Sequence, residues 1–95
     1  MDKRKKPADP EALRARRVAL FDAIERGDIS LRDAAKEMRA LSRLTQPEFA
    51  AHRGVSVKVI KELERGTGNP TLNSLNQIGS IFGLEVGWLR KEKLK

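Results

Sequence analysis

The chain has 95 residues, of which 39% are hydrophobic and only 4% are aromatic. This length and composition indicate one small domain with a mainly aliphatic core. No cysteine is present, which excludes disulfides and cysteine-based zinc sites and fits a reducing cytoplasm. The net charge of +7 favours an anionic partner, and nucleic acid, a membrane surface and an acidic protein all satisfy that charge.

A basic arm and an amphipathic helix occupy the first part of the chain. Residues 1–8 contain four consecutive basic side chains and little to bury, which predicts a disordered arm that is either solvated or bound to phosphates or a minor groove. Asp9 followed by Pro10 is typical of a helix start, and Gly27 ends the helical pattern. We expect the helix within residues 9–27 to pack on the domain or on a second subunit. Its mixed charges argue against a membrane-surface helix, and no apolar run in the chain is long enough to span a bilayer.

Residues 28–91 predict five further helices, which makes the expected fold all-α. Each of the first four begins after a cap residue and carries apolar residues at helical spacing; the caps are Ser30, Thr45, Ser56 and Thr71. A last short helix is expected at about residues 86–91, and residues 92–95 form a basic tail.

Residues 44–70 contain two short helices separated by Gly54, which is typical of a helix-turn-helix. In this motif the second helix enters the major groove and its first residues meet the base edges. We expect four outward, base-reading positions on that helix: Val57, Lys58, Lys61 and Glu62. Lys58 can donate to guanine or to a phosphate, and Val57 can contact a thymine methyl. Glu62 either accepts a hydrogen bond from cytosine or forms an ion pair with Lys58 one turn earlier.

Other polar side chains are candidates for holding the motif on the DNA backbone. Gln46 begins the first motif helix, where free amides and the helix dipole favour a phosphate, and its side chain can bind that phosphate or a flanking base. Further phosphate contacts are expected from Arg43, Arg53, Lys61, Arg65 and Asn69. Glu64 faces inward and needs a cationic partner, for which Arg39 on the preceding helix is the candidate.

The remaining candidates for chemistry have structural interpretations. His52 has no neighbour at metal-ligand spacing and is expected to be a solvated residue at a helix end. Trp88 is expected in the core or at a dimer interface rather than stacked on a base. The sequence contains no arrangement typical of a nucleophile with its base and no glycine-rich phosphate-binding loop that opens a helix, so we expect neither an enzyme nor a cofactor.

An ordered set of residues within positions 31–89 carries a family resemblance: Leu44-Thr45-Gln46, Phe49-Ala50, Gly54-Val55-Ser56, Ile60, Leu63-Glu64-Arg65-Gly66, Asn69-Pro70-Thr71-Leu72 and Leu75. This set closely resembles the Cro/C1-type helix-turn-helix family, also called the xenobiotic-response-element family. The resemblance implies a five-helix lambda-repressor-like domain, to which the helix at residues 9–27 is additional. It also implies a buried pair of Arg39 with Glu64 and contact of Gln46 with a phosphate or a neighbouring base.

Two departures from the family pattern limit what the resemblance implies. Val57 and Glu62 occupy positions that often hold arginine or glutamine, so the base preferences of the family do not transfer. Arg43 stands where glycine is common, which bears on the turn before Gln46.

Within the family, the additional N-terminal helix and the ending at residues 82–86 look like small antitoxin-type repressors paired with HipA-like kinases. That resemblance implies a homodimer in the cytoplasm, associated with the nucleoid, that binds a palindromic operator in double-stranded DNA and represses its own toxin–antitoxin operon. An alternative is that the protein acts mainly by binding and neutralising the toxin. A third interpretation is nonspecific nucleic-acid binding, which predicts little difference between operator and random DNA.

Overall fold

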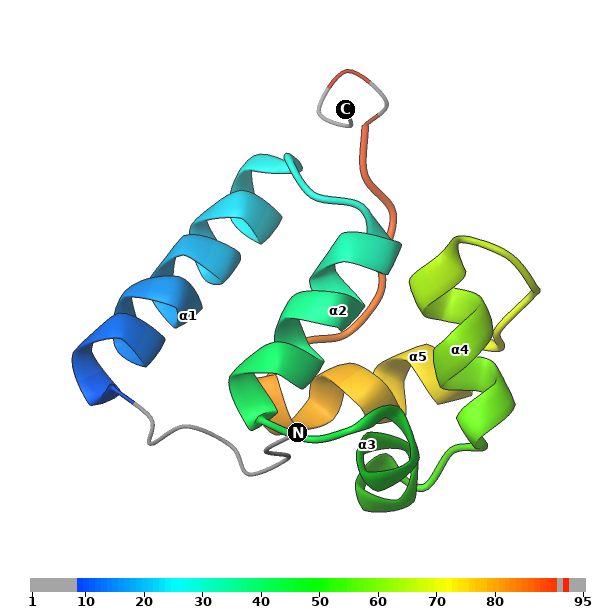
Figure 1. The fold of residues 1–95 in the computed structure, drawn as a ribbon. Helices are drawn as coiled ribbons and strands as arrows, with labels where there is room; N and C mark the ends of the chain where they lie inside the picture. The colour runs from blue at the N-terminus through cyan, green and yellow to red at the C-terminus, as the bar shows by residue number, and fades with distance from the viewer. Residues whose placement is uncertain (1–8, 91, 93–95) are drawn as a thin grey trace.

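The computed structural model describes residues 9–90 and residue 92, and this part of the chain is helical without any strand. Its elements are α1 (Pro10–Arg26), α2 (Leu31–Ser42), α3 (Gln46–Arg53), α4 (Val57–Arg65), α5 (Leu72–Gly79) and the short 3-10 helix η1 (Ser80–Phe82). Helices α1 and α2 lie side by side and run in opposite directions, α4 runs along α2, and α3 lies at the C-terminal end of α2 (Figure 1). The all-α, lambda-repressor-like fold class is confirmed. The predicted basic arm at residues 1–8 and most of the predicted tail lie outside the described residues.

The predicted helix starts are confirmed by their capping hydrogen bonds. Side chains accept bonds from backbone amides at the start of all five α-helices, through Asp9, Ser30, Thr45, Ser56 and Thr71. At α3 the bond is reciprocal, because the Glu48 carboxylate accepts from the Thr45 amide at 2.8 Å. These local bonds fix where each helix begins, so the chain enters α3 and α4 at defined positions.

The end of α2 departs from the pattern of the other helices. Gly27, Gly54 and Gly66 end α1, α3 and α4 in the left-handed backbone region. Arg43 does the same for α2 with φ 59° and ψ 39°, and it is the one non-glycine residue with positive φ in the described part of the chain. The turn expected at a glycine is therefore made by an arginine, which the left-handed region disfavours.

The core is mainly aliphatic and includes the buried Phe49 and Phe82. Its fully buried side chains are Phe49, Ile60 and Ile78, which come from α3, α4 and α5. Helix α1 joins this core through Leu20, which is 2% exposed. Arg17 lies over the Phe82 ring at 4.7 Å, and Arg16 donates to Glu37 on α2 at 2.7 and 3.0 Å. The N-terminal helix was expected to pack on its own domain or on a second subunit, and the structure shows it packed on its own domain.

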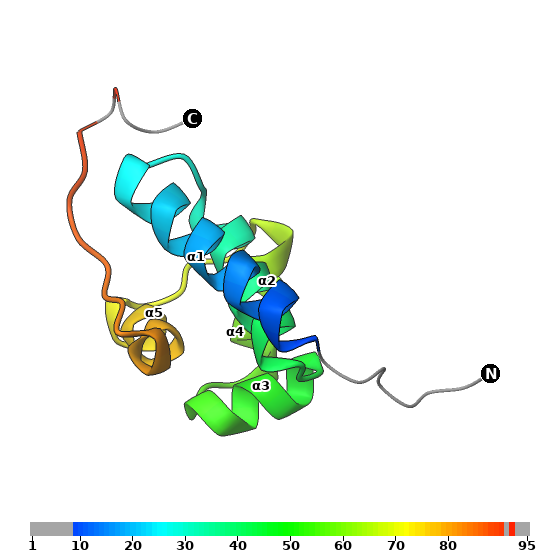
Figure 2. The ribbon, with the colours of Figure 1, turned by 90° about the vertical axis from the view of Figure 1, so that its left-hand side faces the viewer.

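The helix expected at residues 86–91 is wrong, since residues 84–90 have no regular secondary structure. The Val86 amide donates to Asn76 Oδ1 at 2.9 Å, which ties this segment to α5 by a side chain. Six residues are too few to repay helix nucleation, and Gly87 weakens a helix further. The segment runs from α5 toward the loop between α1 and α2 (Figures 1 and 2). Trp88 is fully exposed and therefore does not enter the core of the chain.

Gly79 is needed for the approach of this C-terminal segment. A Cβ atom at Gly79 would lie 3.0 Å from the Leu84 carbonyl oxygen and 3.2 Å from the Leu84 Cβ. This close contact is therefore made with the chain that follows η1. None of the described helices is long and apolar enough to cross a membrane.

Candidate nucleic-acid interface

Helices α3 and α4 form a helix-turn-helix whose angle is set by buried side chains. Phe49 and Ala50 of α3 pack with Ile60 and Leu63 of α4 in the core. Gly54, with φ 73°, ends α3 in the left-handed region and lets the chain turn into α4. Because the apolar side of α4 is buried, its opposite side faces solvent along the whole helix.

The exposed side of α4 carries three of the four side chains expected to read bases. Val57 and Lys61 are exposed, and the Lys58 side chain is 80% exposed. Val57 and Lys58 occupy the first turn of α4, the part of a recognition helix that reaches base edges in this motif. Their exposure leaves them available to a partner.

Glu62 is turned toward the loop that follows α4. A Cβ atom built at Gly68 would lie 2.9 Å from the Glu62 Cβ, so this side chain packs directly over the glycine. The Glu62 carbonyl accepts from the Thr67 amide at 2.9 Å. The carboxylate also lies 4.0 Å from the Lys58 ammonium, and its side chain is 30% exposed. In this conformation Glu62 supports the loop and pairs loosely with Lys58.

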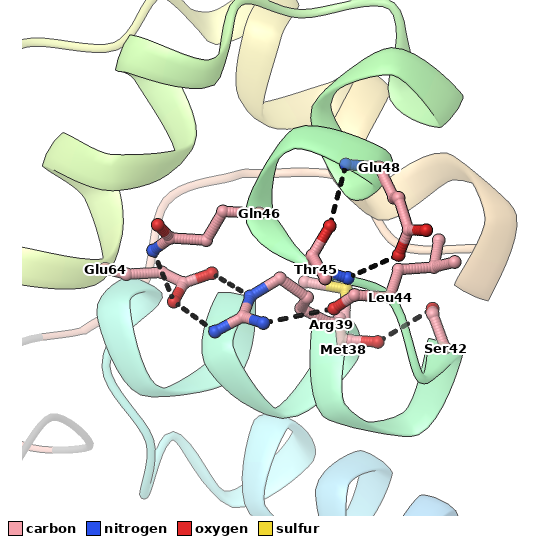
Figure 3. A network of polar contacts seen from close by, with 8 residues as sticks. All are labelled: Met38, Arg39, Ser42, Leu44, Thr45, Gln46, Glu48 and Glu64. Carbon is pink, nitrogen blue, oxygen red and sulfur yellow. Dashed lines mark hydrogen bonds and ion pairs between the residues drawn. The ribbon is translucent and has the colours of Figure 1, made fainter. Parts of the chain in front are cut away.

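The structure brings Arg39 of α2, Gln46 of α3 and Glu64 of α4 together (Figure 3). Arg39 Nε donates to Glu64 Oε2 at 2.7 Å, and Arg39 Nη2 donates to Glu64 Oε1 at 2.9 Å. Gln46 Nε2 donates to the same Oε1 at 3.2 Å, while Arg39 Nη1 donates to the Leu44 carbonyl at 3.1 Å. These bonds connect α2, the start of α3 and α4 through one buried carboxylate.

The pKa of the Glu64 carboxyl is lowered in this network. Burial acts to raise it, but the hydrogen bonds from Arg39 and Gln46 and the positive charges of Arg39 and Lys36 outweigh that effect. Glu64 therefore keeps its charge in the folded protein and remains an acceptor only.

A hollow of about 350 Å³ opens over this network. Its lining comes from α2, α3 and α4: Lys36, Gln46, Lys61, Glu64 and Arg65. Lys36 was missed by the sequence reasoning, although it precedes Arg39 by three residues and so lies on the same side of α2. Three of the five side chains are cationic, so the hollow suits an anionic or electronegative partner.

The structure contradicts the assignment of Arg53 to the phosphate contacts. This residue is 6% exposed, and its guanidinium donates to the Ile78 carbonyl at 3.2 Å and to Ser42 Oγ at 3.3 Å. It lies over the Phe49 ring at 4.4 Å, and burial lowers its pKa. Arg53 follows Phe49 by one helical turn, and this spacing places it on the buried side of α3. Arg53 is therefore a buried structural residue.

The other residues proposed for phosphates occupy the edges of the motif. Arg65 and Asn69 are exposed at the end of α4 and in the loop after it, and Arg43 is half-buried at the end of α2. His52 is exposed, with its ring beside the Arg53 guanidinium. Within residues 9–90 and 92, no three histidine, aspartate or glutamate side chains gather in a way that could hold a metal ion.

Comparisons with known proteins agree with this geometry. A family described as helix-turn-helix matches residues 36–89. A protein of Methanocaldococcus jannaschii described as an uncharacterized HTH-type transcriptional regulator is 34% identical over 56 residues, which are 59% of this chain and 85% of that protein. A regulator of the same description from Archaeoglobus fulgidus is 36% identical over 56 residues, or 59% of this chain and 79% of the relative. No solved structure matches the chain.

Proposed function

Because the chain belongs to the Cro/C1-type helix-turn-helix family of DNA-binding transcriptional regulators, we propose that it is a sequence-specific repressor. In this proposal it binds a palindromic operator as a homodimer and controls its own toxin–antitoxin operon. The observation that supports it best is the exposed side of α4, held outward by the buried Ile60 and Leu63. The function is binding without catalysis, in the cytoplasm and at the nucleoid.

Within this proposal, α4 supplies the base contacts. Val57 meets a thymine methyl, and Lys58 and Lys61 donate to guanine acceptors or adjacent phosphates. Glu62 reaches a cytosine amino group only by leaving the loop that it now covers, so its ion pair with Lys58 is the competing role.

The backbone contacts come from the edges of the motif, through Arg43, Lys61, Arg65 and Asn69, and Gln46 contacts either a phosphate or a neighbouring base. With about three phosphates neutralised by Arg43, Lys61 and Arg65, the logarithm of affinity should fall with the logarithm of salt concentration with a slope of about −3. A flat salt response would argue against this arrangement.

Dimerisation is supported by an apolar hollow of about 720 Å³ between α1, α2, α5 and the C-terminal segment. Leu31 and Trp88 on its rim are exposed although they are large and apolar. A second copy that covers these side chains removes apolar surface from water and presents two α4 helices together. The two half-sites would then lie about 34 Å apart, one turn of DNA.

A second candidate function is neutralisation of a HipA-like toxin, and the same exposed apolar surface favours a protein partner of some kind. Helix α1 supports it further, since it lies outside the matched residues 36–89 and exposes Val18. The neighbouring gene separates the two functions, because a kinase-like toxin gene beside this one favours neutralisation.

Selection of bound duplexes from a random DNA pool, followed by affinity measurements on the full chain, tests the proposal. We expect a palindromic site bound roughly a thousandfold more tightly than random DNA. Lys58→Ala should weaken operator binding, whereas Arg14→Ala removes the same charge from the exposed surface of α1 and should not. Equal affinity for selected and random DNA would favour a nonspecific binder instead.

A further inference from the structure

We propose that Gln46 reads an adenine base and that Glu64 is the positioning residue that presents it. This inference rests on the proposed function and adds a base-reading residue outside α4. The sequence left two possible partners for Gln46, a phosphate or a base, and we propose the base.

The first step is the orientation of the Gln46 amide. Glu64 is 7% exposed, and its carboxylate already accepts two hydrogen bonds from Arg39. A carboxylate can only accept, so the group that Gln46 places 3.2 Å from Glu64 Oε1 must be its amide nitrogen. Figure 3 shows the Gln46 amide oxygen turned away from Glu64. The buried charge thus fixes which end of the amide faces the protein.

The second step is the edge that remains free. In Figure 3 the Gln46 amide oxygen and Glu64 lie on opposite sides of the amide nitrogen, so the bond to Glu64 uses the N–H on the side away from that oxygen. The oxygen and the second N–H then lie side by side as an acceptor and a donor. Adenine presents the complementary pair in the major groove, with its N6 amino group as donor and N7 as acceptor. A phosphate offers acceptors only, so it can pair with the second N–H but not with the Gln46 oxygen.

The third step is the location of this edge. Gln46 and Lys61 line the same hollow, and Lys61 belongs to the exposed side of α4. Lys36, Lys61 and Arg65 surround the Glu64 charge there, so that the carboxylate does not repel DNA. The free edge of Gln46 therefore lies beside the proposed recognition surface and extends it from α4 to α3.

The experiment measures base discrimination by the full chain on its selected operator. At the pair read by Gln46, replacing adenine with 7-deazaadenine, purine or guanine should weaken wild-type binding by about 5- to 150-fold, the range of a good bidentate contact. Gln46→Met keeps the length of the side chain and should abolish this discrimination at one pair in each half-site. Discrimination at all other pairs should be unchanged.

Glu64→Gln tests the positioning role, because a glutamine at this position can accept or donate and no longer fixes the Gln46 amide. Its discrimination at the adenine should fall toward that of Gln46→Met, and it should cause no further loss in a Gln46→Met background. Glu37→Gln is the matched control, since it breaks another bidentate arginine pair away from α4 and should keep full discrimination. If Glu64→Gln does not fold, the wild type and Gln46→Met on the 7-deazaadenine operator still decide whether Gln46 reads the base.

The outcomes separate this inference from the function beneath it. If Gln46→Met weakens every duplex by one factor, Gln46 is a phosphate contact and the inference is overturned while specific binding stands. If Glu64→Gln discriminates as well as Glu37→Gln, Glu64 has a purely structural role. If the wild type binds no DNA sequence preferentially, the proposed function itself is overturned.

Discussion

Arg39 and Glu64 join α2 to α4 through two parallel hydrogen bonds of 2.7 and 2.9 Å. The pair is asymmetric, because the Arg39 side chain is 28% exposed and the Glu64 side chain only 6%. The carboxylate therefore depends on the arginine more than the arginine depends on the carboxylate, since an unpaired buried charge is costly.

Glu64→Gln should lower the free energy of unfolding in a pH-dependent way. The pKa of Glu64 is lowered on folding below its usual value near 4.3, so its contribution is complete above that value and is lost as pH falls through the folded pKa. We expect the free energy of unfolding of Glu64→Gln to be about 1 to 3 kcal/mol below that of the wild type at pH 7. This difference should become smaller toward pH 3. Urea unfolding across this range measures it, and a gap that stays constant with pH would refute the ionic explanation.

Arg43→Gly should stabilise the protein. The residue holds a φ of 59° at the end of α2, where a side chain is disfavoured and glycine is not. We expect a gain of about 0.5 to 1 kcal/mol in the free energy of unfolding, seen as a higher Tm. Arg32→Gly, inside α2, is the opposing control and should destabilise. A lower Tm for Arg43→Gly would show that the arginine side chain contributes more than its backbone strain costs.

Alanine substitutions of Arg53 and Arg65 should have different effects, the first on stability and the second on DNA binding. Arg53→Ala removes hydrogen bonds to the Ile78 carbonyl and Ser42 and should cost about 2 kcal/mol of stability. The salt dependence of DNA binding by the folded protein should not change. Arg65→Ala should leave stability nearly intact and reduce the magnitude of the salt slope by about 1. If Arg53→Ala instead reduced the salt slope and left stability intact, Arg53 would be a DNA contact.

Gly68→Ala should destabilise the loop after α4 for two reasons that can be measured separately. Its φ is 79°, and a Cβ atom would collide with the Glu62 side chain. We expect a loss of about 1 to 3 kcal/mol, from left-handed strain and from the collision. Glu62→Ala in the same chain should recover only the part of the collision made by the carboxylate end, because the Glu62 Cβ, 2.9 Å from the added Cβ atom, remains. If the double variant is no more stable than Gly68→Ala, the carboxylate end of Glu62 is not the obstacle.

The helices could be predicted from the sequence because their signals are local. Thr45 and Glu48 specify the start of α3 through bonds within one turn, and Gly54 and Gly66 specify helix ends in the same way. The association of Arg39 with Glu64 depended on the position of each residue on its own helix. Such positions follow from helical periodicity alone.

Features decided by tertiary packing could not be predicted with the same ease. Residues 86–91 carry apolar side chains at plausible spacing, but the bond from the Val86 amide to Asn76 comes from a different element. Arg53 reads as a surface charge until the Ile78 carbonyl is known to lie beside it. The orientation of Gln46 requires the position of Glu64, which is 18 residues away in sequence.

The exposed position of Trp88 has a consequence for spectroscopy. It is the only tryptophan of the chain, so the intrinsic emission excited selectively in indole comes from one known site. An indole in water emits at longer wavelength than one in an apolar contact. If the hollow beside Trp88 is the surface where a second copy or another protein docks, association should shift the emission to the blue, without any attached dye. DNA that binds only at α4 should leave this signal unchanged.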